Sequence, residues 1–217
     1  MIESPNVLVD CDGVLLTSNA KFSEFIFRKT GVECPQDEVA TKYPIQWSFF
    51  EGDKLKCNEF IAEFQTTSLF ANCDPMPGAV NGVKRLVDHG CVLTIVSSMV
   101  TSEASRENRL KNIASVFGDA FKPENIILLD LGASKYHTLK KFKLPRYFIE
   151  DSIISARDGL AHHWPVTLKS PYNETTLNNA FREKLRGMII HDSWEKVVNY
   201  ILVRCGIPLQ PVTDCRC

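Results

Sequence analysis

The sequence predicts an α/β protein with a parallel sheet and a small helical cap inserted after the first strand. Strand-like and helix-like segments alternate over most of the 217 residues, which is typical of parallel strands joined by right-handed crossovers. A run of apolar residues near the N-terminus ends directly in a pair of aspartates. The next roughly 55 residues contain no strand pattern, which is too long for an ordinary connection and indicates an insertion.

The first strand is predicted at residues 6–9, where apolar residues follow one another without the alternation of a half-exposed strand. It ends in Asp10, and Asp12 and Gly13 follow. Ligands of parallel sheets bind at the carboxyl ends of the strands, so both aspartates are candidate site residues. A plain Asp-Gly turn after a buried strand is the simpler alternative.

The residues after this strand are expected to form the cap. Residues 21–29 have apolar positions at helical spacing, and a second helical stretch begins at Cys57. Prolines, glycines and aromatic residues separate the two helices. We therefore expect a cap over residues 17–76 and a catalytic core made of residues 1–16 and 77–217.

The remainder of the chain alternates regularly between the two kinds of element. The predicted helices cover residues 80–87, 103–117, 135–142 and 153–162, and the predicted strands cover residues 91–96, 125–129, 146–149 and 166–168. Because each helix links two strands, the strands should be parallel and their carboxyl ends should share one edge.

The amino-acid composition argues against some classes of binding partner. With 44% hydrophobic and 24% charged residues, the chain is typical of a soluble globular protein, and its net charge of -1 makes a nucleic-acid partner unfavourable. No window approaches the ~20 apolar residues of a membrane span and the N-terminus has no basic leader pattern, so we expect a cytoplasmic protein without a membrane partner. The eight cysteines stand mostly apart, which favours free thiols, and Cys215 and Cys217 have no predicted role.

Side chains with site chemistry follow several predicted strands and should meet on one edge of the sheet. Carboxylates from two strands crowd together only beside a cation, and oxygen ligands without His or Cys favour Mg²⁺ over zinc. A hydroxyl and a lysine on the same edge suit a phosphoryl group. The residues are Asp10, Asp12, Ser97, Ser98, Lys135, Glu150 and Asp151.

Each of the later residues also has a simpler explanation. Ser97 and Ser98 are good helix caps, and Lys135 fits a solvated helix start. Glu150 and Asp151 precede a predicted helix and fit its N-terminus. The placement of all these groups at successive strand ends favours a joint site over separate local roles.

The motif Val-Asp-Cys-Asp-Gly at residues 9–13, together with the later strand ends, resembles the haloacid dehalogenase-like phosphohydrolases. The resemblance covers residues 7 to about 160 and implies a Rossmann-like core with an inserted cap. It implies that Asp10 is the nucleophile, which forms an aspartyl-phosphate. It also implies that Asp12 is the general acid and base and lends a Mg²⁺ ion its backbone carbonyl.

The other motifs of the resemblance assign the phosphate and metal ligands. Ser97 in Leu-Thr-Ile-Val-Ser-Ser matches the phosphate-binding hydroxyl, with Ser98 beside it. Lys135 in Ala-Ser-Lys-Tyr matches the phosphate-binding lysine. Asp151 in Tyr-Phe-Ile-Glu-Asp-Ser matches a metal carboxylate, which joins Asp10 around the ion with Glu150 as a helper.

Three short motifs resemble the 5'(3')-deoxyribonucleotidase branch of these enzymes. They lie at residues 77–79, 169–173 and 191–201. The loop at residues 15–19 lacks the aromatic residue that commonly stacks on the base in that branch. Within the last motif, Ser193 and Trp194 are expected to cap and pack the final helix.

These observations predict a Mg²⁺-dependent phosphomonoesterase acting on a (deoxy)nucleoside monophosphate, with the base held by the cap at Ser18, Trp47, Phe49 and Phe50. The aromatic residues are equally suited to form the cap's own core. Alternative substrates are a small sugar phosphate or a polynucleotide 3'-phosphate, and the non-enzymatic alternative is a phosphate-binding receiver-like domain. The oligomeric state stays open, with a homodimer as one option.

Overall fold

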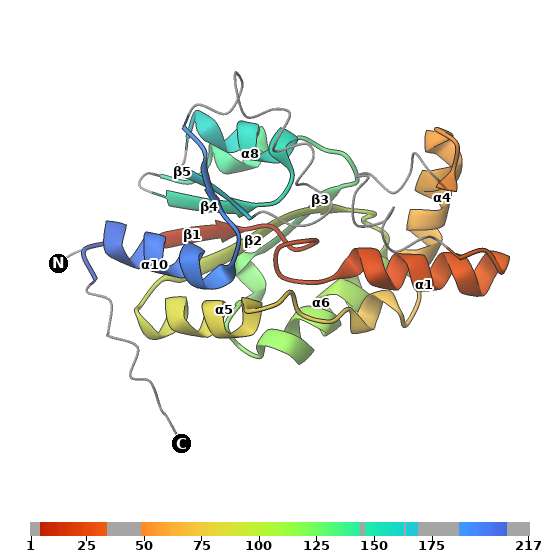
Figure 1. The fold of residues 1–217 in the computed structure, drawn as a ribbon, viewed down its shortest axis with the longest axis horizontal. Coiled ribbons are helices and arrows are strands. Elements are labelled where there is room, and N and C mark those ends of the chain that lie inside the picture. The colour runs from red at the N-terminus through yellow and green to blue at the C-terminus, as the bar shows by residue number, and fades with distance from the viewer. Residues whose placement is uncertain (1–4, 34–48, 144–145, 163, 169–186, 208–217) are drawn as a thin grey trace.

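A computed structural model of the chain describes residues 5–33, 49–143, 146–162, 164–168 and 187–207. These residues form a six-stranded parallel sheet with the strand order β3-β2-β1-β4-β5-β6 (Figure 1). The strands are β1 (Asn6–Val9), β2 (Val92–Met99), β3 (Ile126–Asp130), β4 (Arg146–Glu150), β5 (Trp164–Leu168) and β6 (Ile189–His191). The predicted α/β class with a parallel, Rossmann-like sheet is confirmed.

Strand β1 lies at the centre of the sheet, with β2 on one side and β4 on the other. Its residues Val7, Leu8 and Val9 are fully buried, which agrees with the uninterrupted apolar run in the sequence. Because β1 pairs in parallel with both neighbours, the carboxyl ends of all three strands lie together. The residues that follow β1 and β4 are therefore neighbours in space.

Helices cover both faces of the sheet (Figure 1). On one face lie α5 (Ala79–Asp88), α6 (Glu103–Phe117) and α10 (Trp194–Arg204), and on the other lies α8 (Ile153–Leu160). The short helix α7 (Tyr136–Leu139) packs against α8, and its Leu139 is buried with Leu8 and Phe148. Within the described ranges no helix has the length and apolar character that a membrane crossing requires.

The sequence-based boundaries differ from the structure at some elements. Helix α6 has the predicted bounds, whereas α7 is shorter than the predicted helix over residues 135–142. Strand β2 continues to Met99, so that Ser97 and Ser98 lie inside the strand, and Ser102 caps the following helix. Strand β6 was not predicted, because three residues are too few to show a periodic pattern.

The segment after β1 contains α1 (Ser18–Thr30), α4 (Lys54–Gln65) and the 3-10 turn η1 (Phe70–Asn72). Aromatic rings join the two helices, since the ring of Phe64 lies 5.3 Å from that of Phe22 and 5.7 Å from that of Phe25. The two ends of this segment run side by side. The N–H of Thr17 donates to the carbonyl of Asp74, and the N–H of Met76 donates to that of Leu15. We call these paired segments, residues 15–17 and 74–76, the neck.

The last helix is fixed to the loop after β1 by a tryptophan. Ser193 caps α10, and Trp194 is buried, as the sequence predicts for both residues. The indole N–H of Trp194 donates to the carbonyl of Val14 at 2.9 Å. Its ring lies so close to α5 that a Cβ on Gly82 would come within 2.5 Å of it. Only a glycine fits at that position.

Candidate active site

The site begins where β1 ends. Asp10 is buried, and its backbone N–H donates to the carbonyl of Ile149 in β4, which keeps the two strands paired up to this residue. The chain then turns sharply at Gly13, whose φ of 79° suits a residue without a Cβ. The carbonyl of Cys11 accepts hydrogen bonds from the N–H groups of Leu15 and Leu16. This tight loop presents Asp12 at the edge of the sheet.

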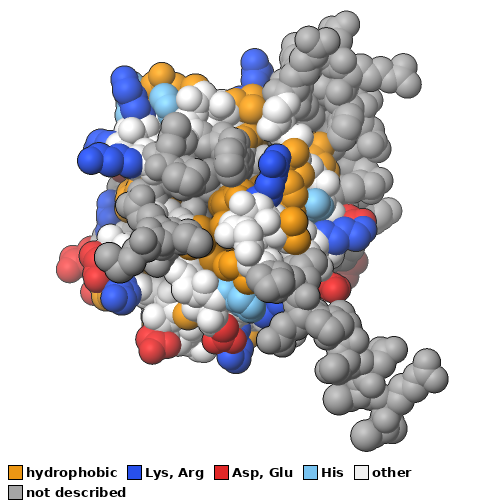
Figure 2. All heavy atoms as spheres, turned by 90° about the vertical axis from the view of Figure 1, so that its left-hand side faces the viewer, with side chains coloured by type: hydrophobic (Ala, Val, Ile, Leu, Met, Phe, Trp, Pro, Cys, Tyr) orange, Lys and Arg blue, Asp and Glu red, His pale blue; other side chains and the backbone are white. Residues whose placement is uncertain are grey.

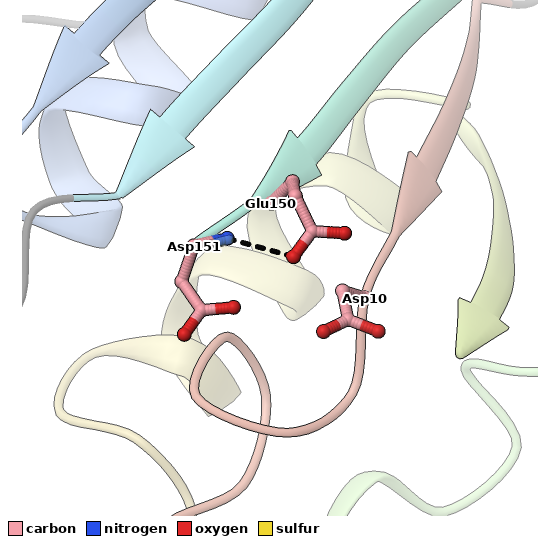
Figure 3. A group of neighbouring side chains, drawn as sticks. All are labelled: Asp10, Glu150 and Asp151. Atoms are coloured by element: carbon pink, nitrogen blue, oxygen red, sulfur yellow. Dashed lines mark hydrogen bonds between the residues drawn. The ribbon is translucent and has the colours of Figure 1, made fainter. Parts of the chain in front are cut away.

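Two further acids follow β4. Glu150 is fully buried, and Asp151 is 5% exposed. One oxygen of Glu150, Oε1, accepts hydrogen bonds from the backbone N–H groups of Asp151 and Ser152 at 3.1 and 3.0 Å. Figure 3 shows the carboxylates of Asp10, Glu150 and Asp151 gathered at the ends of the two strands. Each of the three offers an oxygen within 4.8 Å of the others.

Lys135 inserts its ammonium group among these acids. Its Nζ lies 2.6 Å from Oδ1 of Asp10 and 2.7 Å from Oε2 of Glu150, and the residue is only 3% exposed. Asp158 of α8 fixes the loop that carries the lysine, because its carboxylate accepts the backbone N–H of Lys135 at 2.9 Å and the hydroxyl of Ser134 at 2.8 Å. No motif in the sequence indicates this role of Asp158.

The electrostatics of the cluster indicate a shortage of positive charge. Burial alone would lower the pKa of Lys135, but the carboxylates of Asp10 and Glu150 outweigh it and hold the pKa above its usual value. Burial and the neighbouring Asp10 raise the pKa of Glu150 well above its usual range, and Lys135 opposes this shift. A further cation beside the acids would relieve the repulsion between them.

The two serines of β2 have different surroundings. Ser97 is 2% exposed and lies in β2, the strand next to β1. The hydroxyl of Ser98 donates to the carbonyl of Asp130 at 2.6 Å and accepts the N–H of Gly132 at 2.9 Å. Ser98 therefore ties the end of β3 to its loop, and a phosphate-binding role for either serine stays a prediction.

Asp12 has a partner that the sequence did not suggest. Nη2 of Arg109, in the middle of α6, donates to Oδ1 of Asp12 at 2.5 Å. Arg109 is fully buried, whereas the side chain of Asp12 is 29% exposed. In the sequence Arg109 looks like one of several polar residues on a solvated helix face, so only the tertiary fold identifies it.

The predicted base-binding residues of the cap fall into three groups. Ser18 begins α1 and is half-buried, and so is Phe49. Phe50 is 3% exposed and packs edge-on against Phe60 with 5.0 Å between the ring centroids. It belongs to the aromatic cluster that joins α1 and α4, and the ring centroid of Phe49 lies 4.9 Å from its own. Trp47 lies outside the described residues.

The face of the molecule toward the amino end of β1 has a different character. Figure 2 shows hydrophobic, basic, acidic and uncharged polar side chains mixed on it. The acids and the buried lysine described above lie at the carboxyl ends of the strands. The carboxyl edge of the sheet is therefore the candidate active site.

Neither the family models nor the curated proteins include a match to this chain. Solved structures do match. A haloacid dehalogenase-like hydrolase, SP0104 of Streptococcus pneumoniae, has a TM-score of 0.64 at 14% identity, covering 93% of this chain and 100% of that one. A HAD family hydrolase of Deinococcus radiodurans with bound phosphate and sodium has a TM-score of 0.59 at 16% identity, covering 95% and 98%.

A third match is YfnB of Bacillus subtilis in a magnesium-bound form, with a TM-score of 0.58 at 13% identity, covering 91% of this chain and 98% of that one. At identities this low the three matches establish similarity of fold. The chain therefore has the fold of the haloacid dehalogenase-like hydrolases.

Proposed function

We propose that this protein is a magnesium-dependent phosphomonoesterase that works through a phosphorylated Asp10. The observation that carries the proposal is the buried cluster at the ends of β1 and β4, where Lys135 lies between two carboxylates and a third acid stands beside them. Such a cluster pairs a nucleophilic oxygen with a fixed positive charge for the phosphate. The fold and the phosphate bound in the Deinococcus radiodurans hydrolase support the same reading.

The acids fit a hard divalent cation. Mg²⁺ prefers oxygen ligands and is usually held by one or two carboxylates, with water and substrate phosphate completing its shell. Glu150 already accepts hydrogen bonds on both oxygens, so Asp10 and Asp151 would hold the ion, together with the backbone carbonyl of Asp12. When bound, Mg²⁺ supplies positive charge that polarises the phosphoryl group. The magnesium bound to YfnB supports this choice of metal.

The chain's own residues then carry two steps. In the first, an oxygen of Asp10 forms a bond to phosphorus, and the bond from phosphorus to the ester oxygen breaks. Asp12 gives its proton to the departing oxygen. In the second, a water molecule gives a proton to Asp12 and its oxygen forms a bond to phosphorus. The bond between phosphorus and the Asp10 oxygen breaks, so that phosphate is released and the carboxylate of Asp10 is restored. Lys135 and Ser97 would hold the equatorial oxygens throughout.

The proposal includes a (deoxy)nucleoside monophosphate as the substrate. The core residues contact only phosphate and metal, so the cap has to recognise the leaving group. Ser18 and Phe49 are half-buried and accessible enough for this, and Trp47 is proposed with them on the strength of the sequence. A base stacked on one aromatic ring gains ~1–3 kcal/mol. The packed ring of Phe50 would serve to position Phe49.

The experiment that tests the function is phosphate release from a panel of esters, measured with Mg²⁺ and with EDTA. The panel contains nucleoside 5'- and 3'-monophosphates, sugar phosphates and an oligonucleotide with a 3'-phosphate. We expect Mg²⁺-dependent turnover with a preference for nucleotides. Turnover that is unchanged in EDTA would contradict the requirement for Mg²⁺. A preference for sugar phosphates would contradict the nucleotide substrate but would still support the phosphatase activity.

A variant pair tests the role of the cap. Phe49→Ala should lower kcat/KM for the preferred nucleotide by ~5–150-fold, the equivalent of a stacking energy of ~1–3 kcal/mol, and should spare a small generic ester. The control is Phe27→Ala, which removes a phenylalanine that is 47% exposed on α1. Equal losses on both esters, or no loss on either, would show that Phe49 does not recognise the base.

A further inference from the structure

The ion pair between Arg109 and Asp12 has the properties of a functional contact. A fully buried arginine is rare in proteins, and replacing a buried ion pair with apolar residues is often neutral or even stabilising. Stability alone therefore explains such a pair poorly. Here the arginine is completely buried while the acid keeps 29% of its side chain exposed. The exposed part of this ion pair is therefore the carboxylate of Asp12, in the loop that carries the candidate site.

Arg109 packs against a buried aromatic ring, and its helix is hydrogen-bonded to a neighbouring segment. Its guanidinium carbon lies 4.0 Å from the centroid of the buried Phe70 ring, which is a cation–π contact. On the same helix, the amide of Asn108 donates to the carbonyls of Gln65 and Thr67 at 3.1 and 3.3 Å. Asn112 exchanges two hydrogen bonds with the backbone of Cys73. Helix α6 is thereby fixed to the segment that leads out of the cap.

One end of the guanidinium has no hydrogen-bond acceptor among the described residues. Nη1 of Arg109 is buried and has no hydrogen-bond partner there, and leaving a buried polar group unpaired is destabilising. An arginine side chain stays protonated in folded proteins. The group is therefore a permanent cation that keeps one good contact, to Asp12, at the expense of another.

We propose that Arg109 is a positioning residue for Asp12, with Nη2 holding Oδ1 so that Oδ2 is kept for the leaving oxygen and for the attacking water. This inference rests on the phosphomonoesterase function proposed above. In the first step the pair of electrons of the breaking phosphorus–oxygen bond goes to the ester oxygen, which takes the proton from Oδ2. In the second step the proton returns to Oδ2 from water. Arg109 itself exchanges no proton.

The test uses leaving groups of different acidity. A phenolate such as 4-nitrophenolate leaves without help, whereas an alkoxide leaves only with a proton from a general acid, so the two esters differ in their need for Asp12. The value of kcat/KM depends only on the steps up to and including the first irreversible bond cleavage, which is the step in which the alcohol leaves. We therefore compare kcat/KM for 4-nitrophenyl phosphate and benzyl phosphate in the full-length, Mg²⁺-loaded protein.

Arg109→Met keeps most of the packing on Phe70 and removes the donors to Asp12. We expect it to lower kcat/KM for benzyl phosphate by ~10–100-fold and to change kcat/KM for 4-nitrophenyl phosphate by less than about 3-fold. The first loss is smaller than the whole contribution of general acid catalysis, which is ~10²–10⁴-fold. Asp12→Asn should show the same selectivity with a larger loss. Combined with Asp12→Asn, the Arg109→Met change should have no further selective effect.

Asn108→Ala is the matched control, because it loosens the same helix from the cap without touching Asp12. It should affect both esters alike. If Arg109→Met also lowers both esters by one factor, or neither, the residue is structural and the inference fails. If that variant does not fold, as judged by circular dichroism, the same comparison is made with Arg109→Leu, which also lacks the donors, and an unselective effect there is equally decisive. A parent protein that hydrolyses neither ester overturns the proposed function and this inference together.

Discussion

Replacing Lys135 with methionine perturbs the candidate site most directly. Methionine has nearly the same length, so the change removes charge and hydrogen bonds and keeps most of the volume. The parent ammonium lies 2.6 Å from an oxygen of Asp10 and 2.7 Å from an oxygen of Glu150, and all three groups are buried. The variant leaves both carboxylates without their shared cation.

The size of the effect follows from this burial. Removing one partner of a buried ion pair costs ~3–5 kcal/mol, because the remaining charge is left without compensation. Oε1 of Glu150 keeps its two backbone hydrogen bonds in the variant, so the loss should stay within that range even though two acids are affected. For a chain of this size each kcal/mol lowers Tm by ~2–4 °C. We therefore expect Tm to fall by ~6–20 °C.

The same reasoning predicts how metal changes the result. A divalent ion beside Asp10 and Asp151 supplies part of the charge that the variant lacks, so Mg²⁺ should raise the Tm of Lys135→Met more than that of the parent. At a hundredfold excess over Kd, a bound ion stabilises the folded state by about 2.7 kcal/mol. Phosphate release should be lost in both conditions, because the lysine is also proposed to bind the phosphate oxygens.

The assay is thermal unfolding by circular dichroism, with EDTA and with Mg²⁺. The control is Lys140→Met, which removes an exposed lysine just after α7. It should shift Tm by no more than about 2 °C, as is usual for a surface substitution. A Lys135→Met protein as stable as the Lys140→Met protein would refute the account of Lys135 as the buried counter-charge of Asp10 and Glu150.

Three further predictions concern the nucleophile, the packing of the last helix and the effect of pH on stability. Asp10→Asn should abolish phosphate release while leaving the circular dichroism spectrum unchanged, and undiminished turnover would remove Asp10 from the nucleophilic role. Gly82→Ala should destabilise the fold by ~1–3 kcal/mol, because its Cβ would meet the Trp194 ring at 2.5 Å, and denaturant unfolding at the parent's midpoint would contradict that contact. Burial lowers the pKa of His191 below its usual value of 6.5, so the unfolded chain binds a proton at this residue more readily than the folded protein. Stability should therefore fall as the pH drops below that value, and the fall should be smaller in His191→Gln; identical pH profiles would exclude a contribution from His191.

The parts of the fold that the sequence predicted are those with a local signature. The buried run at residues 7–9, the helix at residues 103–117 and the acids that end β1 and β4 are each recognisable within a few residues of chain. Parallel crossovers then bring the strand ends together whatever the details of the loops. The neighbourhood of Asp10 and Asp151 was predictable for this reason, even though 140 or so residues separate them along the chain.

The supporting residues could not be predicted in the same way. Arg109, Asp158 and Asn112 lie on helices, where they read as ordinary polar positions. Their roles depend on which way each helix is turned about its axis and on which loop it meets, and these are set by the packing of the whole core. Strand β6 escaped prediction for a related reason, because its three residues become a strand only through pairing with β5.

Different elements of the fold hold the two aspartates of the candidate site in place. Asp10, Lys135 and Glu150 are held by β1, β4 and the loop fixed by Asp158, all within the core. Asp12 is held by Arg109, whose helix is hydrogen-bonded to the segment leaving the cap, and its loop continues directly into the neck. In the proposed mechanism, the nucleophile Asp10 therefore depends on the core, whereas the acid Asp12 depends on its ion pair with the buried Arg109.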